Sequence, residues 1–406
     1  MSWKNTFKQI LKRAPEMKSS RAAPLLVQFG LHQPRFTPRQ YDRLADEGYQ
    51  KNVIAYRCIR LISQNAAAVP WMVYKGRGAD KKPLDDHPLL TLLQRPNPMQ
   101  GGAELFESVF SFFLIAGNSY LETGGPVSTP PRELWALRPD RMRVIPGIGG
   151  VPESYRYAVG GKSQDFPVNP LTGRAQILHL KSFHPLDDWY GMSPLEAAAI
   201  GIDQHNDAAR WNASLLQTSG RPSGALIYRP SHPDAADTLT EEQRQALKHE
   251  LEQYFSGPEN AGRPLVLEGG LSWQEMSLSP KDMDWLAGKD VSAREIALAF
   301  HVPAQLIGVN GSLTFANFEQ ARLAFFDDAV LPLLDHVKDD LNNWLAPQFG
   351  ADIHIGYDID KIEALAPRRQ QTWDRLTNAD FMTINEKRKE LNMEPLDGGN
   401  VLKGGS

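Results

Sequence analysis

The sequence predicts an α+β fold divided among several lobes, and three stretches support this prediction. Residues 133–180 alternate apolar and polar side chains between Gly/Pro turns, which is typical of β-strands. Residues 193–219 form an Ala-rich helical pattern with Pro194 in its first turn. Residues 317–346 repeat apolar side chains every three or four positions, which predicts one long helix.

Length and composition place the chain among folded proteins with two or three domains or one elongated, lobed subunit. Of its 406 residues, 41% are hydrophobic and 23% are charged, which excludes disorder of the whole chain. The single cysteine, Cys58, excludes an intramolecular disulfide and is predicted to be a buried structural thiol in a reducing compartment. No apolar run has the length needed to span a bilayer, and the N-terminus has no secretory pattern. We therefore expect assembly in a cytoplasm.

The net charge of −4 argues against a protein that clamps nucleic acid by broad phosphate neutralisation. It does not argue against DNA passing nearby, because every gripped phosphate must be released before DNA can move. The long helix predicted at 317–346 is itself acidic. It carries six acidic and two basic residues, a net charge of −4: Glu319, Asp327, Asp328, Asp335, Asp339 and Asp340 against Arg322 and Lys338.

The N-terminal half is predicted to mix helices and strands. Residues 1–24 form a basic arm. Helices are expected at 51–68, 87–98 and 103–117, and strands at 71–74, 118–122, 134–138, 141–145, 155–159 and 177–181.

The C-terminal half begins with the Ala-rich helix and a small α/β unit. Strands are expected at 225–228, 264–268, 272–276 and 352–357, and helices at 240–255, 281–300 and 368–393. A short loop, 308–317, precedes the long helix, whose start is predicted by capping-box spacing of Asn317 and Gln320. Pro332 should kink that helix because it removes one backbone hydrogen bond.

The Ala-rich helix carries a stripe of mostly small residues, which permits close helix–helix approach. Gly201 inside the helix costs about 1 kcal/mol relative to alanine, so packing must compensate. The stripe consists of Leu195, Ala199, Ile202, Ala209, Ala213 and Leu216.

Motifs for catalysis are absent from the sequence. Gly161-Lys-Ser163 lacks the upstream glycine of a phosphate-binding loop, because position 156 is Arg156, and it is better explained as a hairpin turn. His179, His184, Asp187 and Asp188 could in principle supply metal ligands, but a strand around His179 and a turn or solvated loop at Asp187-Asp188 explain them better. We assign no catalytic residue, cofactor or metal.

Several short motifs occur in a fixed order across roughly residues 40–346. They include His87-Pro-Leu-Leu90, Arg95-Pro-Asn-Pro98, Gly117-Asn-Ser-Tyr-Leu-Glu122, Leu137-Arg-Pro-Asp-Arg-Met-Arg-Val144, Gly191-Met-Ser-Pro-Leu-Glu-Ala197, Ile296-Ala-Leu-Ala-Phe-His-Val-Pro303 and Phe318-Glu-Gln-Ala-Arg322. In this order the motifs resemble those of one known family, the portal proteins of tailed bacteriophages with long non-contractile tails and of gene transfer agents.

The resemblance implies a non-enzymatic subunit of a ring, commonly of twelve copies, at one capsid vertex. Double-stranded DNA would enter and leave through its channel, and the terminase large subunit, a head-tail adaptor and the major capsid protein would be partners. The lobes would be a wing (25–192 and 319–366), two stem helices (193–220 and 281–306), a clip (221–280) and a short crown with the C-terminal tail (367–406).

The same resemblance places a tunnel loop at 307–318 and the small-residue stripe in the packing of neighbouring stems. The loop residues expected to face the channel are Asn310, Ser312, Leu313, Thr314, Phe315 and Asn317. The ring would reside in the virion after assembly in the bacterial host cytoplasm, with no membrane contact.

Two alternatives stay open from the sequence. One is a metal-dependent hydrolase that uses the His179–Asp188 cluster. The other is a capsid- or membrane-associated adaptor that binds through the basic arm, residues 1–24.

Overall fold

The computed structural model describes residues 41–76, 81–125, 130–217, 224–228, 242, 245–247, 249, 271–275, 285–309, 315–391 and 393–402. The basic arm, the strand predicted at 264–268 and most of the helix predicted at 240–255 lie outside these residues. Among the helices it does describe, none is long and apolar enough to cross a membrane.

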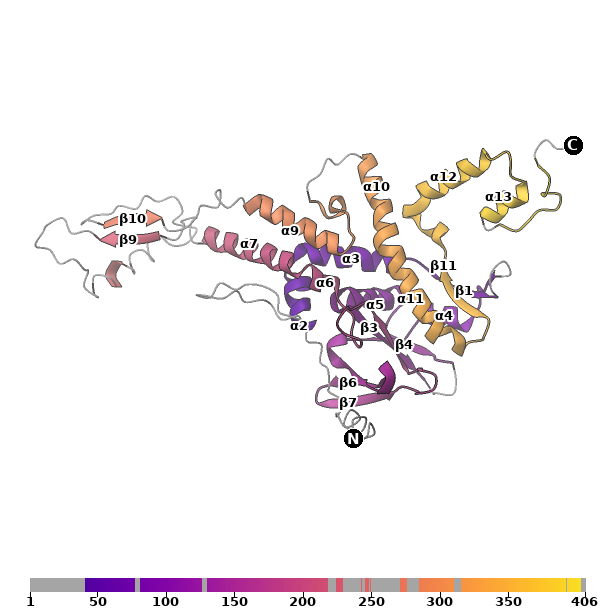
Figure 1. Cartoon of the computed structure of the whole chain (residues 1–406), viewed down its shortest axis with the longest axis horizontal. Coiled ribbons are helices and arrows are strands. Elements are labelled where there is room, and N and C mark those ends of the chain that lie inside the picture. Colours follow the sequence, from indigo (N-terminus) through magenta and orange to yellow (C-terminus); the bar gives the residue numbers. More distant parts are fainter. Residues whose placement is uncertain are drawn as a thin grey trace, which may run out of the picture.

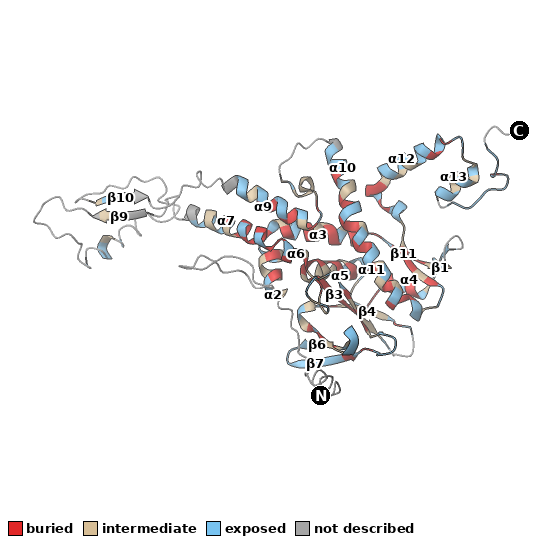
Figure 2. Ribbon diagram, viewed as in Figure 1, coloured by how far each residue is buried: buried red, intermediate tan, exposed pale blue. Residues whose placement is uncertain are grey.

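The body of the molecule is built around two packed helices, α3 (Val53–Ala67) and α5 (Gly102–Ala116). Cys58 lies on the buried face of α3 at 0% exposure, and burial raises the pKa of its thiol to about 12. The prediction of a buried structural thiol is therefore confirmed. Figure 2 shows the buried residues gathered in this body.

The turn after α5 requires glycine. Gly117 ends the helix in the left-handed conformation with φ 67°, and a Cβ there would lie 2.5 Å from the backbone carbon of Met192. The C-terminal end of α5 therefore lies against the backbone of residues 191–192.

Two three-stranded antiparallel sheets flank the helices. The first has the order β11-β1-β2, with Val73 of β1 opposite Ile355 of β11, so strands almost 300 residues apart in sequence are paired. The second has the order β4-β3-β8. The strand bounds are β1 Trp71–Lys75, β2 Lys82–Pro83, β3 Asn118–Gly124, β4 Glu133–Leu137, β8 Ile177–Lys181 and β11 Ile353–Tyr357.

A third sheet, in the order β5-β6-β7, lies at the lower edge of the body in Figure 1. Its strands are β5 Met142–Pro146, β6 Pro152–Val159 and β7 Lys162–Pro167, and the last was not predicted as a strand. Gly160 and Gly161, both at positive φ, connect β6 to β7. The predicted hairpin turn is confirmed, since positive φ at both central residues is the geometry of a tight hairpin.

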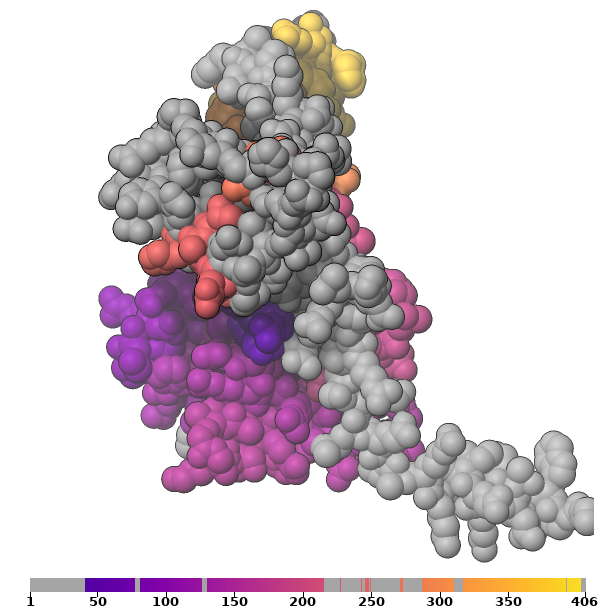
Figure 3. Space-filling model, turned by 90° about the vertical axis from the view of Figure 1, so that its left-hand side faces the viewer, coloured from indigo at the N-terminus to yellow at the C-terminus, as the bar shows by residue number. Residues whose placement is uncertain are grey.

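Two long helices project from the body side by side (Figure 1). They are α7 (Ala199–Gln217) and α9 (Trp285–Ala299). The antiparallel strands β9 (Gly224–Tyr228) and β10 (Leu271–Glu275) lie beyond their far ends (Figure 1), and Figure 3 looks at the molecule from that end. The Ala-rich segment is not one helix, because a short helix, α6 (Pro194–Ala197), precedes α7 and the two meet at Ala198.

The long acidic helix follows in three segments, α10 (Phe315–Phe325), the π-helical turn η7 (Phe326–Val330) and α11 (Leu331–Trp344). The amide of Leu331 donates to the carbonyl of Phe326, five residues back, next to Pro332 in the first turn of α11. Where the sequence predicted a kink at Pro332, the structure has a widened turn just before it, which accommodates the missing proline N–H.

The C-terminal unit carries α12 (Ala366–Thr377) and α13 (Ile384–Glu390) and extends away from the body (Figure 1). The remaining helices are short: α2 Tyr41–Arg43, η1 Leu44–Gln50, α4 Pro88–Gln94, η3 Pro139–Arg141, η4 Ile148–Gly150, η6 Ala304–Ile307, η8 Ala346–Gln348, η9 Ile359–Lys361 and η10 Glu363–Leu365.

Candidate channel-forming helix pair and its junction

The helices α7 and α9 pack against each other, and Gly201 of α7 lies at their contact. A Cβ on Gly201 would lie 3.4 Å from Glu295 Oε2 and 3.5 Å from the carbonyl oxygen of Ser292. The hydroxyl of Ser292, which is buried, donates to the carbonyl of Gly288 and lies 3.4 Å from Gln204 Oε1. These are ordinary contact distances, so alanine would also fit at position 201, and the predicted compensation for the propensity cost of Gly201 is not observed.

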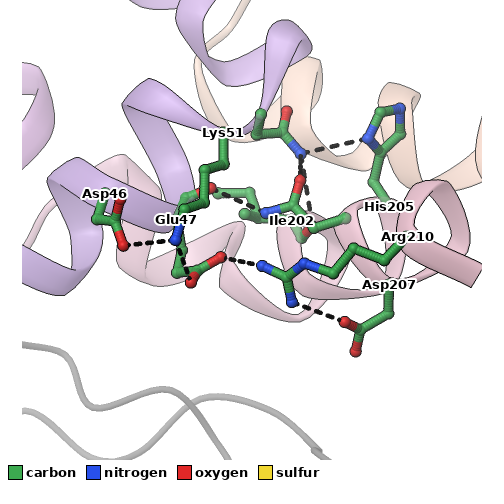
Figure 4. A network of polar contacts seen from close by, with 9 residues as sticks. Asp46, Glu47, Lys51, Ile202, His205, Asp207 and Arg210 are labelled. Carbon is green, nitrogen blue, oxygen red and sulfur yellow. Dashed lines mark hydrogen bonds and ion pairs between the residues drawn. The ribbon is translucent and has the colours of Figure 1, made fainter. Parts of the chain in front are cut away.

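A buried polar junction holds the base of α7 on the body (Figure 4). Asn52 caps α3, since its Oδ1 accepts the amides of Ile54 at 3.1 Å and Ala55 at 3.0 Å. Its side-chain nitrogen faces α7, with Asn206 Oδ1 at 3.0 Å and His205 Nδ1 at 3.3 Å. One side chain therefore caps one helix and anchors another.

His205 fits this junction as a neutral imidazole. Its Nδ1 accepts from the Asn52 amide, so the proton of the neutral ring belongs on Nε2. Burial, with Lys289 as a second cause, lowers the pKa of His205 below its ordinary value. The neutral form that the contact needs is the form that the surroundings favour.

Charged groups continue the junction at the surface (Figure 4). Glu47 pairs with Arg210 of α7 and, at 3.0 Å, with Lys51, which also pairs with Asp46 at 2.6 Å. The side-chain nitrogen Nδ2 of Asn206 donates to the backbone carbonyl of Glu47 at 2.9 Å. Exposed pairs of this kind contribute about 0–1 kcal/mol each, so the buried Asn52 contacts carry more of the stability.

Sequence reasoning missed the junction. An asparagine before an apolar helical run is a capping signal, so the role of Asn52 at α3 could have been found. Its partners on α7 stand more than 150 residues away and have no motif spacing.

The predicted small-residue stripe divides into two parts. Leu195, Ala199 and Ile202 are buried within the single subunit, so for these three the predicted packing against a neighbour is replaced by packing inside the body. Ala209 and Ala213 continue the stripe where α7 leaves the body, and both are exposed. The side chain of Leu216 lies outside the described residues.

The predicted tunnel loop is described only at its edges. Asn310, Ser312, Leu313 and Thr314 lie outside the described residues. Phe315 and Asn317 belong to the first turn of α10, because the helix begins at Phe315 and not at a cap on Asn317. The capping-box prediction was wrong by two residues, and the loop is correspondingly shorter.

Several carboxylates of the acidic helix α10–η7–α11 have partners that offset their negative charge. Asp335 pairs with Lys338 at 2.6 Å and accepts the hydroxyl of Tyr357 at 2.9 Å. Asp327 pairs at 2.9 Å with Arg368 of α12, a cation from outside the helix. The net negative charge that this helix presents is therefore lower than the count along its own sequence.

The predicted metal ligands do not form a metal site. His179 is packed between strands, where its Nε2 donates to Asn118 Oδ1 at 2.9 Å and its ring stacks on Tyr120. His184 Nδ1 accepts the amide of Leu186, and Asp187 Oδ1 accepts the amide of Trp189. Among the residues that the structure describes, no three His, Cys, Asp or Glu side chains gather to hold a metal ion.

Comparisons with known proteins agree with this architecture. The profile of the family "Phage portal protein" matches residues 54–392. The portal protein of Enterobacteria phage HK97 is 25% identical over 370 residues, which cover 88% of this chain and 82% of that protein.

Solved structures of gene transfer agent (GTA) particles are more similar. A chain in "Neck of empty GTA particle computed with C6 symmetry" is 43% identical, with a TM-score of 0.69, and the match covers 90% of this chain and 97% of that one. A chain in "Neck of native GTA particle computed with C12 symmetry" is 41% identical, with a TM-score of 0.67 and coverage of 93% and 97%. The chain therefore belongs to the phage portal protein family, in the type that includes the HK97 portal and the gene transfer agent neck.

Proposed function

We propose that this chain is the repeating subunit of a portal ring at one capsid vertex, through which double-stranded DNA is packaged and ejected. The observation that carries the proposal is the 43% identity to a chain of the gene transfer agent neck over 90% of this chain. The role is structural, and the ring would be part of the virion after assembly in the bacterial host cytoplasm.

The ring is proposed to contain twelve copies, in keeping with the C12 symmetry of the native neck structure. The projecting pair α7/α9 would form the stem, and the unit that carries β9 and β10 would form the clip that meets the terminase large subunit or the head-tail adaptor. Residues 25–192 and 319–366 would form the wing next to the major capsid protein, and residues 367–406 the crown.

Proposed behaviour toward DNA follows from charge. The chain has a net charge of −4, and the described part of α10–η7–α11 presents acidic side chains, some of them paired. An acidic helix directly after the loop gives little counterion-release binding, so DNA would slide past the loop without being held. The loop between α9 and α10 would brush or gate the duplex without gripping it.

The test uses the full chain in a packaging system. Replacing Leu313 and Phe315 with aspartate should leave ring formation intact and lower the DNA packaged per particle, because like charge would then face the phosphates. Arg60→Asp, a charge change on the body helix α3, is the matched control and should leave packaging unchanged. Normal packaging in the loop variant would remove the loop from the mechanism.

A further inference from the structure

The C-terminal unit, residues 366–402, lacks an apolar core of its own. Among its described residues, Leu376 and Ala379 are the apolar side chains that are buried. Seven large apolar side chains are exposed instead: Trp373, Phe381, Ile384, Met393, Leu396, Val401 and Leu402. Figure 2 shows the same contrast, with α12 and α13 mostly exposed beside a buried body.

Hydrogen bonds nevertheless hold the unit in a defined shape. Thr383 and Glu386 form a complete capping box at the start of α13. Asn385 donates to the carbonyl of Leu396 at 3.0 Å and accepts the amide of the same residue at 2.7 Å, which ties the tail back onto α13. A small unit that keeps a defined shape but leaves its apolar side chains exposed is typical of an interaction surface. A partner that covers those side chains would supply the apolar burial that the unit lacks on its own.

The charges of the unit favour a second copy as that partner. Its described residues hold six basic and six acidic side chains, so the net charge is zero and nothing repels an identical unit. Only Arg368 among them forms an ion pair, and its partner Asp327 lies in η7. Acidic and basic groups such as Arg375, Lys389, Glu390 and Asp397 thus remain for pairing across an interface.

Zero net charge also argues against DNA as the partner. A surface that holds duplex DNA releases counterions by placing an excess of Lys and Arg on the phosphates. The unit offers no such excess, although a DNA-facing role would be the simplest use for a helical crown inside the head.

We propose that the C-terminal unit is a clasp between neighbouring copies of this chain, in which the apolar side chains around the α12–α13 connection pack against the adjacent subunit. This inference rests on the proposed ring. It assigns the last helices of the chain to ring cohesion, with Phe381 and Ile384 at the contact.

Thiol labelling in the assembled oligomer tests the clasp. Phe381, at 81% exposure, and Ile384 are each replaced by cysteine in the full chain, and the rate of reaction with a maleimide dye is measured before and after assembly. The native Cys58 does not compete, since it is buried and its thiol pKa is raised to about 12. Ile148→Cys, at the tip of the β5–β6 turn and 97% exposed, is the matched control.

Assembly should slow labelling at positions 381 and 384 by about tenfold or more and leave position 148 unchanged. Equal rates at 381 before and after assembly would overturn the clasp, and so would protection that appears only when duplex DNA is added. Protection of 148 to the same degree would also overturn it, because occlusion would then be general.

Failure of the proposed function looks different, because no oligomer would form at all. Phe381→Asp gives a second readout. It should fold, since the Phe381 side chain is 81% exposed in the single subunit, and it should shift assembly to higher protein concentration by about tenfold or more. Assembly at the wild-type concentration would contradict the clasp.

Discussion

Removing Asn52 should loosen the joint between the body and α7 more than any exposed ion pair could. The side chain is 1% exposed and serves two helices, so Asn52→Ala removes an N-cap worth about 1 kcal/mol and leaves His205 and Asn206 without their buried donor. Each orphaned contact costs about 1 kcal/mol or more, which gives a total loss of about 3 kcal/mol.

Asn52→Ser separates the two contributions. Serine still accepts the amides of Ile54 and Ala55 as a cap but is too short to reach α7, so the loss should fall to about 2 kcal/mol. Urea unfolding of the full chain gives the free energies, and hydrogen exchange reports whether the amides of α7 around Asn206 exchange faster. Wild-type stability in Asn52→Ala, or unchanged exchange in α7, would refute the reasoning.

Three further predictions concern stability. Burial lowers the pKa of His179 to about 3, so the unfolded chain binds a proton more tightly than the folded chain. The free energy of unfolding should therefore be highest above about pH 6.5 and should fall by about 1.4 kcal/mol per pH unit as the pH decreases toward 4. Unfolding measured across this pH range, with His179→Gln as the reference, checks this. Gly201→Ala should leave the melting temperature unchanged or raise it, because its Cβ meets α9 only at ordinary contact distance, whereas Gly201→Leu should cost about 1–3 kcal/mol by forcing α9 away; equal effects of the two would contradict the close packing. Gly117→Ala should cost about 3 kcal/mol in thermal unfolding, because it combines a positive φ with a clash against the Met192 backbone; Gly160→Ala, at a positive φ in open space, should cost less.

The sequence predicted best the helices and strands whose ends are marked by proline, glycine or a change of pattern. Pro88 and the paired prolines after Arg95 bound α4, Gly117 ends α5, and β8 was predicted with its observed bounds, Ile177–Lys181. These features depend on neighbours within a few residues, so composition and periodicity were sufficient.

Features that depend on tertiary contacts were beyond the same reasoning. Periodicity alone could not show that the helix before α7 breaks at Ala198, or that Leu195 and Ile202 would be covered by the subunit's own body. The polar junction joins Asn52 to residues of α7 across more than 150 positions, and the charge of Asp327 in η7 is balanced by Arg368 from a later helix. Pairings at that separation leave no spacing in a single sequence.

An image of the purified full chain after assembly, with its symmetry counted, tests the portal assignment most directly. We expect a closed ring of identical subunits around a central hole wide enough for duplex DNA, with the α7/α9 pairs surrounding the channel. A chain that remains monomeric under all assembly conditions, or that forms an oligomer without a central channel, would contradict it.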